Sequence, residues 1–396
     1  MTELEDNGLF AALDPSPVSA PLMPELSPSG RRTPRFVSGR ELSTGRPAIA
    51  VQVMQASHVP IVAQICVDEG LAAILTIDTR TDPMRAIHDQ VAAFSGITRD
   101  VTHTLVDANR YAGSGRVSGV HDLDVGWIDA QLNLGFEYAL TNSPYIPEGD
   151  TAAVESILDQ VVRMRRPVIA ALPIANWWLR NKRGRKFLLE RINRAGVPVA
   201  LMVEHAKDPM GVVDVVRGLV AILAAEPPVL LLRSDLSAIG ACAHGAAGGA
   251  IGTTTGLRHI FPKPKPDQKG GGYRDPQVAV FVPQLLAYMS VSKAADLAQY
   301  TGIDKFMECT CYRCNGLGVE WITDETTAFD HSLRAITDFA ATRLGTRKTP
   351  QEMKDGWSLA LETAQHKHLD IEGTTGVEVG IPKFFGAWRP VYGAGE

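Results

Sequence analysis

Short apolar runs alternate with amphipathic helical patterns through most of this 396-residue chain. Eight of these runs have the length and the β-branched content that strands favour, and helical patterns separate them. Strands that alternate with helices form parallel sheets, and eight of them can close into a barrel. The sequence therefore predicts an α/β fold, a (β/α)8 TIM-type barrel, with strands at Ala48–Val53, Ala73–Ile77, Thr102–Asp107, Tyr138–Thr141, Pro167–Leu172, Val197–Glu204, Val229–Arg233 and Gly249–Thr253.

Two later segments, Gln284–Ser290 and Lys305–Cys309, also resemble strands, so ten candidates compete for eight places. Either the N-terminal pair of runs forms a hairpin that acts as a lid, or two of the middle runs lie outside the barrel, and both arrangements stay open. Lys263–Gly272 lies between the earlier and later candidates and is rich in proline and glycine, which interrupt regular structure. We expect this segment to be a surface loop near the barrel mouth.

Composition divides the chain into three expected parts. Residues 1–46 are rich in Pro, Ser, Glu and Gly without periodicity, which predicts a flexible arm. Residues 47–300 are expected to form the catalytic barrel, and residues 301–396 a zinc-binding and helical C-terminal region. No apolar run has the ~18 residues that a membrane span requires, and the N-terminus lacks a signal-peptide pattern. We therefore expect a cytoplasmic protein without a membrane partner.

Three of the five cysteines lie within six positions, and a histidine follows in the next helical pattern. Thiolates separated by one and two residues can turn their sulfurs toward one centre, and a histidine from the following helix can complete a tetrahedral shell. Free cysteines seldom cluster in this way. The spacing therefore predicts a structural Zn²⁺ site, with the ligands Cys309, Cys311, Cys314 and His331.

The order of motifs resembles that of the tRNA-guanine transglycosylase superfamily, including its relatives that insert 7-deazaguanine bases into DNA. An aspartate precedes a glycine-containing turn in Leu105–Gly113, a helix with a Gln and a Leu-Gly step follows in Trp127–Gly135, and a Pro-Tyr loop lies in Tyr138–Pro147. The Cys-x-Cys-x-x-Cys motif with its distant histidine comes last. The resemblance implies a base-exchange glycosyltransferase that replaces guanine by a 7-deazaguanine-type base. Its implied partners are nucleic acid, either tRNA or DNA, and a purine-like base, and it allows a homodimer.

Base exchange at a glycosidic carbon needs a carboxylate that attacks the anomeric centre and a second group that moves a proton. Asp107 is the acid/base candidate because it ends an apolar strand before a turn of small residues, although a capping role explains it too. Asp235 is the nucleophile candidate at the barrel mouth, where Arg233 would keep it ionised, and a structural ion pair is the alternative. Glu308 is a third catalytic candidate, and support of the metal ligands is its rival role.

Several polar side chains near the predicted strand ends could contact the substrate. Thr141, Asn142 and Ser143 offer short donors and acceptors to a flat heterocycle, and Tyr111 could stack on it. Arg258 and His259 follow a glycine-rich segment near the last strand, where many barrels bind phosphate. A packed histidine beside a surface arginine explains this last pair equally well.

The formal net charge of −5 argues against a surface covered with basic residues, so binding of nucleic acid would need a local basic patch. Basic residues beside aromatic rings can neutralise phosphates and stack on bases. A solvated helix face with a partly buried tryptophan pair is an equally good interpretation. The patch consists of Arg163, Arg165 and Arg166 before one predicted strand, and of Arg180, Lys182, Arg183, Arg185 and Lys186 after it, beside Trp177 and Trp178.

Two other functions remain open. The barrel could act on a free nucleoside or another small glycoside with the same carboxylates. A zinc-stapled barrel could instead serve as a nucleic-acid-binding scaffold in a modification complex. Thr141 and Asn142 stand where the superfamily holds a purine-recognising aspartate, and this difference favours the scaffold.

Overall fold

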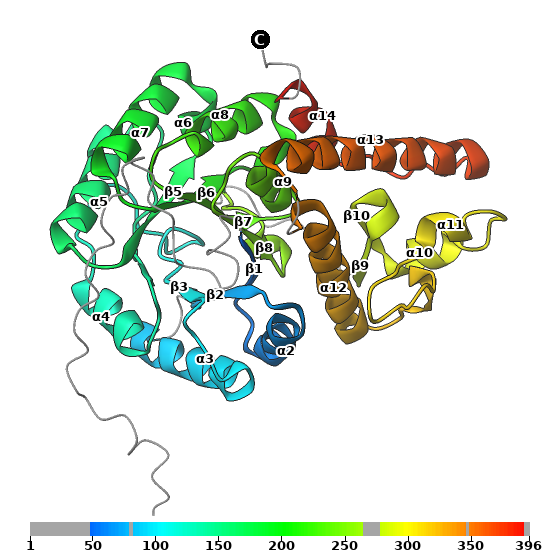
Figure 1. Cartoon of the computed structure of the whole chain (residues 1–396), viewed down its shortest axis with the longest axis horizontal. Coiled ribbons are helices and arrows are strands. Elements are labelled where there is room, and N and C mark those ends of the chain that lie inside the picture. The colour runs from blue at the N-terminus through cyan, green and yellow to red at the C-terminus, as the bar shows by residue number, and fades with distance from the viewer. Residues whose placement is uncertain (1–47, 79–81, 264–277, 346–347, 392–396) are drawn as a thin grey trace, which may run out of the picture.

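The computed structural model describes residues 48–78, 82–263, 278–345 and 348–391. The predicted arm 1–46 and the predicted loop beyond Lys263 lie outside these residues. Eight parallel strands pair in the order β3-β2-β1-β8-β7-β6-β5-β4, and helices surround them (Figure 1). The predicted (β/α)8 barrel is confirmed. Its strands are β1 (Ala48–Val53), β2 (Ala72–Thr76), β3 (Thr104–Asp107), β4 (Ala139–Leu140), β5 (Val168–Ala175), β6 (Val199–Glu204), β7 (Val229–Ser234) and β8 (Gly248–Gly252).

The eight earlier runs all become barrel strands, so neither arrangement expected from the sequence is correct. The additional strands lie after β8, where β10 (Ala287–Ser290) pairs antiparallel with β9 (Ala279–Val282) in a hairpin outside the barrel. The predicted strand at Lys305–Cys309 is wrong, because the short helix α11 (Asp304–Met307) occupies most of it. A run this short carries no periodicity that separates a helix from a strand.

The helices begin at residues that favour helix starts. Asp124 accepts hydrogen bonds from the first amides of α4, Asn181 does so for α7, and Thr349 forms a capping box with Glu352 at the start of α13. In the part of the chain that the structure describes, no helix has both the length and the apolar character that crossing a membrane requires. Besides α11, the helices are α2 (Val59–Glu69), α3 (Pro83–Thr98), α4 (Val125–Asn133), α5 (Thr151–Met164), α6 (Trp177–Arg180), α7 (Lys182–Ala195), α8 (Val213–Leu223), α9 (Ser237–Ala243), α10 (Val291–Leu297), α12 (Glu325–Leu344), α13 (Pro350–Thr375) and α14 (Lys383–Trp388).

β3 and β4 stand at the two ends of the strand order, so β4 has no paired strand on its β3 side. A side chain there makes the hydrogen bonds that a neighbouring strand would make. Gln131 of α4 donates from Nε2 to the carbonyl of Leu140 (3.0 Å) and accepts from the Leu140 N–H through Oε1 (2.9 Å). The indole Nε1 of Trp127 donates to the same carbonyl (2.9 Å). Buried backbone groups are costly to leave unpaired, so the Gln131 amide stabilises the edge of a strand that has only two residues.

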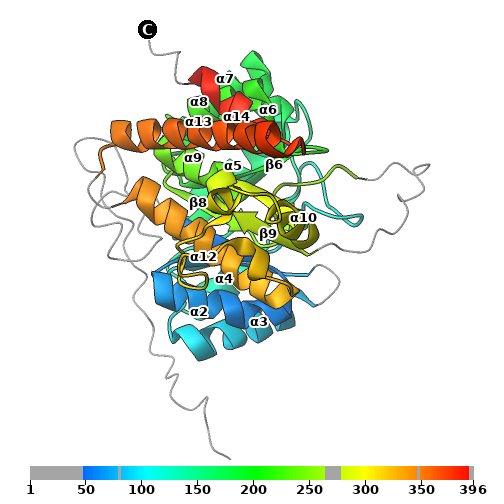
Figure 2. The same cartoon turned by 90° about the vertical axis from the view of Figure 1, so that its right-hand side faces the viewer.

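The chain leaves the ring of helices after β8 and returns to it with α12. The described part of residues 253–324 holds the β9–β10 hairpin, α10, α11 and the cysteine motif, to one side of the barrel (Figures 1 and 2). α12 then packs against α9 and α2, in the place of the eighth helix. Its Arg334 pairs with Asp68 (2.8 Å) and Glu69 (3.5 Å) of α2. The first and last helices of the ring are therefore joined by ion pairs between a buried arginine and two exposed carboxylates.

Candidate functional site at the carboxyl ends of the strands

A buried polar network centred on Asp107 lies at the carboxyl ends of the strands. Gln52 donates to Asp107 Oδ2 (3.1 Å), Tyr111 Oη donates to the same oxygen (2.6 Å), and the backbone N–H of Asn109 donates to Oδ1 (2.9 Å). Arg233 Nε lies 3.8 Å from Oδ2, and all these side chains are buried. Asp107 thus has donors on both oxygens, as suits a carboxylate. Tyr111, expected to stack on a base, is part of this network instead.

Arg233 forms a different ion pair from the expected one. Among the described residues it pairs with Asp107 and not with Asp235. Its Nη2 also donates to Asn109 Oδ1 (2.6 Å), and its backbone N–H donates to Gln52 Oε1 (2.9 Å). Arg233 and Asn109 have positive φ angles of 48° and 54°, which are strained for residues with a Cβ. Asparagine tolerates this region, so the strain lies mainly at Arg233, which the buried network holds in place.

Thr141, Asn142 and Ser143, expected to contact a base, are buried and engaged by the fold. Thr141 Oγ1 accepts a hydrogen bond from the Ala171 N–H (2.8 Å) and lies 2.7 Å from Ser143 Oγ. Asn142 Oδ1 accepts from the Asp124 N–H (3.0 Å), at the start of α4. These contacts fix the chain after β4, so positioning of the loop is the role that the structure shows for them.

Four buried polar atoms at the barrel mouth have no hydrogen-bond partner within the described residues, and other such atoms lie elsewhere in the molecule. The four are Arg116 Nε, Arg233 Nε, Thr253 Oγ1 and His259 Nε2. Such groups are nearly always hydrogen-bonded in folded proteins. TIM barrels present their active sites at this end, so these four groups are candidates for contact with a polar ligand.

Arg258 and His259, expected to grip a phosphate, lie just beyond β8. The Arg258 guanidinium sits 3.9 Å from the centroid of the Tyr288 ring, and its Nε donates to the Gly252 carbonyl (3.4 Å). Burial and nearby positive charges lower the pKa of His259 to about 4. His259 is therefore neutral near pH 7 and offers a ligand hydrogen bonding rather than charge.

A cleft of about 370 Å³ lies between the ends of β6 and β7, the β10 strand and α14. Asp208 and Asp235 both line it, Asp208 from the turn after β6 and Asp235 directly after β7. Burial, and next the charge of Asp235, raise the pKa of Asp208 to about 7. Hydrogen bonds from the backbone N–H groups of Met210 and Gly211 lower this pKa, but by less than the first two effects raise it. A carboxyl with a pKa near neutrality can both donate and accept a proton. The cleft thus holds two carboxyl groups, and the pKa of one of them lies near neutral pH.

Asp208 was not among the residues that the sequence singled out. It precedes Pro209 and accepts a hydrogen bond from the Met210 N–H (2.8 Å), which is the ordinary behaviour of a capping aspartate. Only the pairing of β6 with β7 brings it near Asp235. The one sequence signal was its place four residues after the end of a predicted strand.

A second charged cluster ties the loop after β3 to the end of β6. Arg116 pairs with Glu204, and its guanidinium lies 3.9 Å from the centroid of the Tyr145 ring. Burial, and next the charge of Glu204, raise the pKa of Tyr145 above its ordinary value. Asn176 donates to the Glu204 carbonyl (3.0 Å). This cluster fixes the wall of the mouth on the side of β5 and β6.

The predicted basic patch divides into two groups at opposite ends of the barrel. Arg163, Arg165 and Arg166 precede β5, whereas the residues from Arg180 to Lys186 follow it, at the mouth. Trp178 is fully buried and donates from Nε1 to a backbone carbonyl (2.8 Å), and the Trp177 ring packs on Gly184. The expected stacking of bases on this pair is therefore wrong for Trp178. The mouth still carries exposed positive charge, on Arg180, Lys182, Arg183 and Lys186.

The four predicted metal ligands come together beside the barrel. Ligand atoms of Cys309, Cys311, Cys314 and His331 all lie within 4.8 Å of one another, and all four residues are buried. His331 Nδ1 lies 3.1 Å from Cys314 Sγ and 3.5 Å from Cys311 Sγ. Three sulfurs and an imidazole nitrogen are the donor set of a closed tetrahedral site. The cluster could therefore hold a metal ion.

The surroundings of the cluster also fit a metal. His331 Nε2 lies 2.8 Å from the Phe281 carbonyl of β9, so we assign the ring proton to Nε2, which leaves the Nδ1 lone pair toward the sulfurs. Contact with the other two sulfurs lowers the pKa of the Cys311 thiol, and similar contact raises that of Cys309. Crowding thus moves the pKa values of these two thiols in opposite directions. A cation would stabilise three thiolates together, which ordinary core packing cannot do.

Glu308 lies outside the barrel mouth. It is exposed, forms an isolated antiparallel bridge with Gly318, and lines a pocket against α12 and α13. The structure therefore distributes the three candidate carboxylates over three settings. Asp107 belongs to the buried network, Asp235 to the cleft with Asp208, and Glu308 to the segment that carries the cysteines.

No protein-family model and no curated protein matches this chain. Solved structures similar to it include the type I 3-dehydroquinate dehydratase of Clostridium difficile, at 10% identity and a TM-score of 0.31 over 55% of this chain and 88% of that one. The 3-dehydroquinate dehydratase of Aquifex aeolicus is 13% identical, with a TM-score of 0.33 over 54% and 93%. A putative fructose-1,6-biphosphate aldolase of Coccidioides immitis is 11% identical, with a TM-score of 0.32 over 58% and 81%.

Proposed function

We propose that this protein is a base-exchange transglycosylase that replaces guanine by a 7-deazaguanine-type base in nucleic acid, either tRNA or DNA. The observation that carries the proposal is the pair of carboxyl groups, Asp208 and Asp235, in a cleft at the carboxyl ends of barrel strands. Glycosidic chemistry with retention needs one carboxylate as nucleophile and one carboxyl as proton donor. The order of motifs, with the cysteine cluster last, supports the same assignment through its resemblance to the transglycosylase superfamily.

In this mechanism Asp235 attacks C1′ of the nucleotide and forms a glycosyl ester. The C1′–N9 bond breaks, its electron pair goes to N9 of guanine, and the protonated Asp208 supplies the proton. The incoming base then loses its N9 proton to the Asp208 carboxylate and attacks C1′. The ester bond to Asp235 breaks and restores its carboxylate. Two displacements retain the configuration, and no oxidant or reductant is consumed.

Asp107 takes a positioning role in this proposal rather than the acid/base role first expected. Its oxygens already accept hydrogen bonds from four neighbours, and Arg233 lies against it. Arg233 and His259 instead each have a buried nitrogen without a hydrogen-bond partner among the described residues. A purine edge offers the acceptors and donors that such groups need.

Basic residues at the mouth supply the nucleic-acid part of the proposal. Arg180, Lys182, Arg183 and Lys186 are exposed on the end of α6 and the start of α7, next to the carboxyl end of β5. Contacts between such residues and phosphates release counterions, so binding should weaken steeply as salt rises. A free nucleoside also fits a cleft of this size, and its binding would lack that salt dependence.

Zinc is the ion that we propose for the cysteine cluster, in a structural role. Four protein ligands leave no open position for a substrate, which distinguishes a structural site from a catalytic one. The cysteines belong to the excursion, which we define as the described part of residues 253–324, and His331 belongs to α12. The ion would therefore attach the excursion to the ring of helices.

Incorporation of labelled guanine into bulk tRNA or DNA tests the proposed function. Wild-type protein should transfer label into acid-precipitable material, and Asp235→Asn and Asp208→Asn should each lose at least about 100-fold in rate. Asp214→Asn, on the exposed side of α8, is the matched control and should keep full activity. Full activity in both cleft variants would refute the assignment of these residues. Salt-sensitive binding without any incorporation would favour the scaffold.

A further inference from the structure

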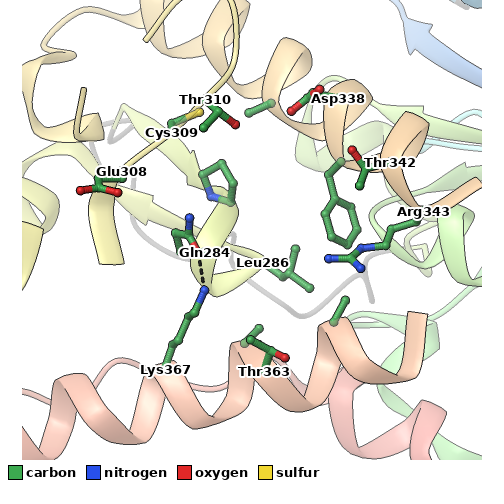
Figure 3. Close-up of a pocket in the computed structure, with 15 residues that line it drawn as sticks. Gln284, Leu286, Glu308, Cys309, Thr310, Asp338, Thr342, Arg343, Thr363 and Lys367 are labelled. Carbon is green, nitrogen blue, oxygen red and sulfur yellow. Dashed lines mark hydrogen bonds between the residues drawn. The ribbon is translucent and has the colours of Figure 1, made fainter. Parts of the chain in front are cut away.

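A second pocket, of about 230 Å³, lies outside the barrel between α12, α13 and the turn that joins β9 to β10 (Figure 3). Two cations enter it from different helices, Arg343 from the last turn of α12 and Lys367 from the middle of α13. Threonine hydroxyls from both helices and from the cysteine segment complete its polar lining. The pocket therefore brings two cations and several hydroxyl donors together, with Glu308 and Asp338 also in its lining.

The fold does not neutralise either cation. Among the described residues, neither Arg343 nor Lys367 has a carboxylate within ion-pair distance, although Glu308 and Asp338 also line the pocket. Burial lowers the pKa of Arg343, and burial and then the charge of Arg343 lower the pKa of Lys367. Two like charges in one pocket destabilise each other unless a counter-ion is present.

The other contacts of these side chains leave donors available. Lys367 Nζ donates to Gln284 Oε1, which is neutral. Arg343 lies 5.1 Å from the centroid of the Phe339 ring, which is a neutral neighbour. Its buried Nε has no hydrogen-bond partner in the described part of the chain. A nearby Lys348 already binds the Thr342 carbonyl (2.6 Å) at the end of α12, so Arg343 is not needed to cap that helix.

We infer that this pocket is an oxyanion site that binds a phosphate group through Arg343 and Lys367. The planar guanidinium and the ammonium suit the tetrahedral oxygens of phosphate, and the threonine hydroxyls and the Gln284 amide add neutral donors. The phosphate could belong to a free phosphate ester or to the backbone of a nucleic acid. The inference is independent of the carboxylates in the barrel cleft.

Calorimetric titration of the full chain with inorganic phosphate tests the site. Wild-type protein should bind phosphate, and Arg343→Gln and Lys367→Gln should each weaken binding at least about tenfold. Lys367→Arg keeps the charge and should restore most of the affinity. Arg85→Gln, an exposed residue of α3, and Asp235→Asn, in the barrel cleft, should leave phosphate binding unchanged.

A parallel titration with a short single-stranded oligothymidylate separates the two sources of phosphate. If Arg343→Gln weakens the binding of the oligonucleotide as much as it weakens the binding of phosphate, the site binds the nucleic-acid backbone. If only inorganic phosphate is affected, the natural ligand is a free phosphate ester. Absence of phosphate binding to the wild-type protein, or equal affinity in correctly folded Arg343→Gln and Lys367→Gln variants, would overturn the inference.

Discussion

Asp107 and Asp208 are both carboxyl groups near the barrel mouth, yet their surroundings differ. Asp107 accepts four hydrogen bonds and lies against the cation of Arg233, so its contacts suit a hydrogen-bond acceptor. Asp208 lies in a cleft beside the charge of Asp235, and its pKa rises to about 7. Environment thus separates the roles of two identical groups, one held as an acceptor and one able to carry a proton.

Replacing Asp208 by Asn should make the protein more stable at alkaline pH while it abolishes catalysis. The pKa of Asp208 is about 7 in the folded protein and 3.8 in its ordinary, exposed state. Between these two pH values the folded protein therefore binds a proton that the unfolded chain has lost. The free energy of unfolding therefore falls as the pH rises through this window. Urea unfolding should show that the stability of Asp208→Asn relative to the wild type increases by about 2 to 3 kcal/mol between pH 5 and pH 8. Equal effects at both pH values would contradict the raised pKa, and Asp214→Asn should show no effect at either.

Replacing Asp107 by Asn should destabilise the fold as well as impair activity. Arg233 would keep its buried charge without the carboxylate that lies 3.8 Å from its Nε. Removal of one partner from a buried pair costs about 3 kcal/mol. Chemical denaturation should show this loss in Asp107→Asn, and the double variant Asp107→Asn with Arg233→Met should recover part of it. An additive loss in the double variant would show that the two side chains are not coupled.

At the scale of elements, close approaches between helices limit which side chains the barrel tolerates. Gly218 of α8 lies against the backbone of α6, where an added Cβ would stand 2.1 Å from the Leu179 carbonyl oxygen. Gly96 of α3 is also helical, but an added Cβ would meet no atom within 4 Å. The two glycines therefore have different reasons to be present, and only the first is required for packing.

Gly218→Ala and Gly96→Ala should change stability in opposite directions. Alanine at 218 must push α8 away from α6 and should lower the free energy of unfolding by about 3 kcal/mol or more. Alanine at 96 removes only the backbone freedom of glycine and should raise it by about 0.5 to 1 kcal/mol. Thermal unfolding of both variants provides the comparison. A neutral Gly218→Ala would mean that the α6–α8 contact is looser than the structure has it.

The strands were predictable because each has a run of apolar residues that a barrel buries, as in Val229–Ser234. The hydrogen bonds from Gln131 to the backbone of β4 were not predictable, because they depend on which residues face the gap beside that strand. The same holds for the site. Cys309 and its partners are close in sequence and were predicted, whereas the pairing of Arg233 with Asp107 and of Asp208 with Asp235 arises from strands that only the fold brings together.

At the scale of the whole molecule, the cysteine cluster joins an excursion of the chain to the ring of helices. The excursion begins after β8, and the ring is completed by α12, which carries His331. His331 contacts the cysteines through Nδ1 and the β9 carbonyl of Phe281 through Nε2. One imidazole thus connects the cysteine segment, the hairpin and the eighth helix, so loss of the metal should loosen all three together.

Purified wild-type protein should contain about one zinc ion per chain, and Cys311→Ser should lose it. The barrel strands do not pass through the cluster, so the far-ultraviolet circular dichroism of the variant should stay close to that of the wild type at room temperature. Its melting temperature should nevertheless fall by about 5 °C or more, because α12 loses its attachment to the excursion. Cys66→Ala is the matched control, since Cys66 is also buried but lies on α2 away from the cluster, and it should retain the zinc. Elemental analysis that finds no metal in folded wild-type protein would contradict the zinc assignment. Retention of zinc by Cys311→Ser would contradict the ligand set.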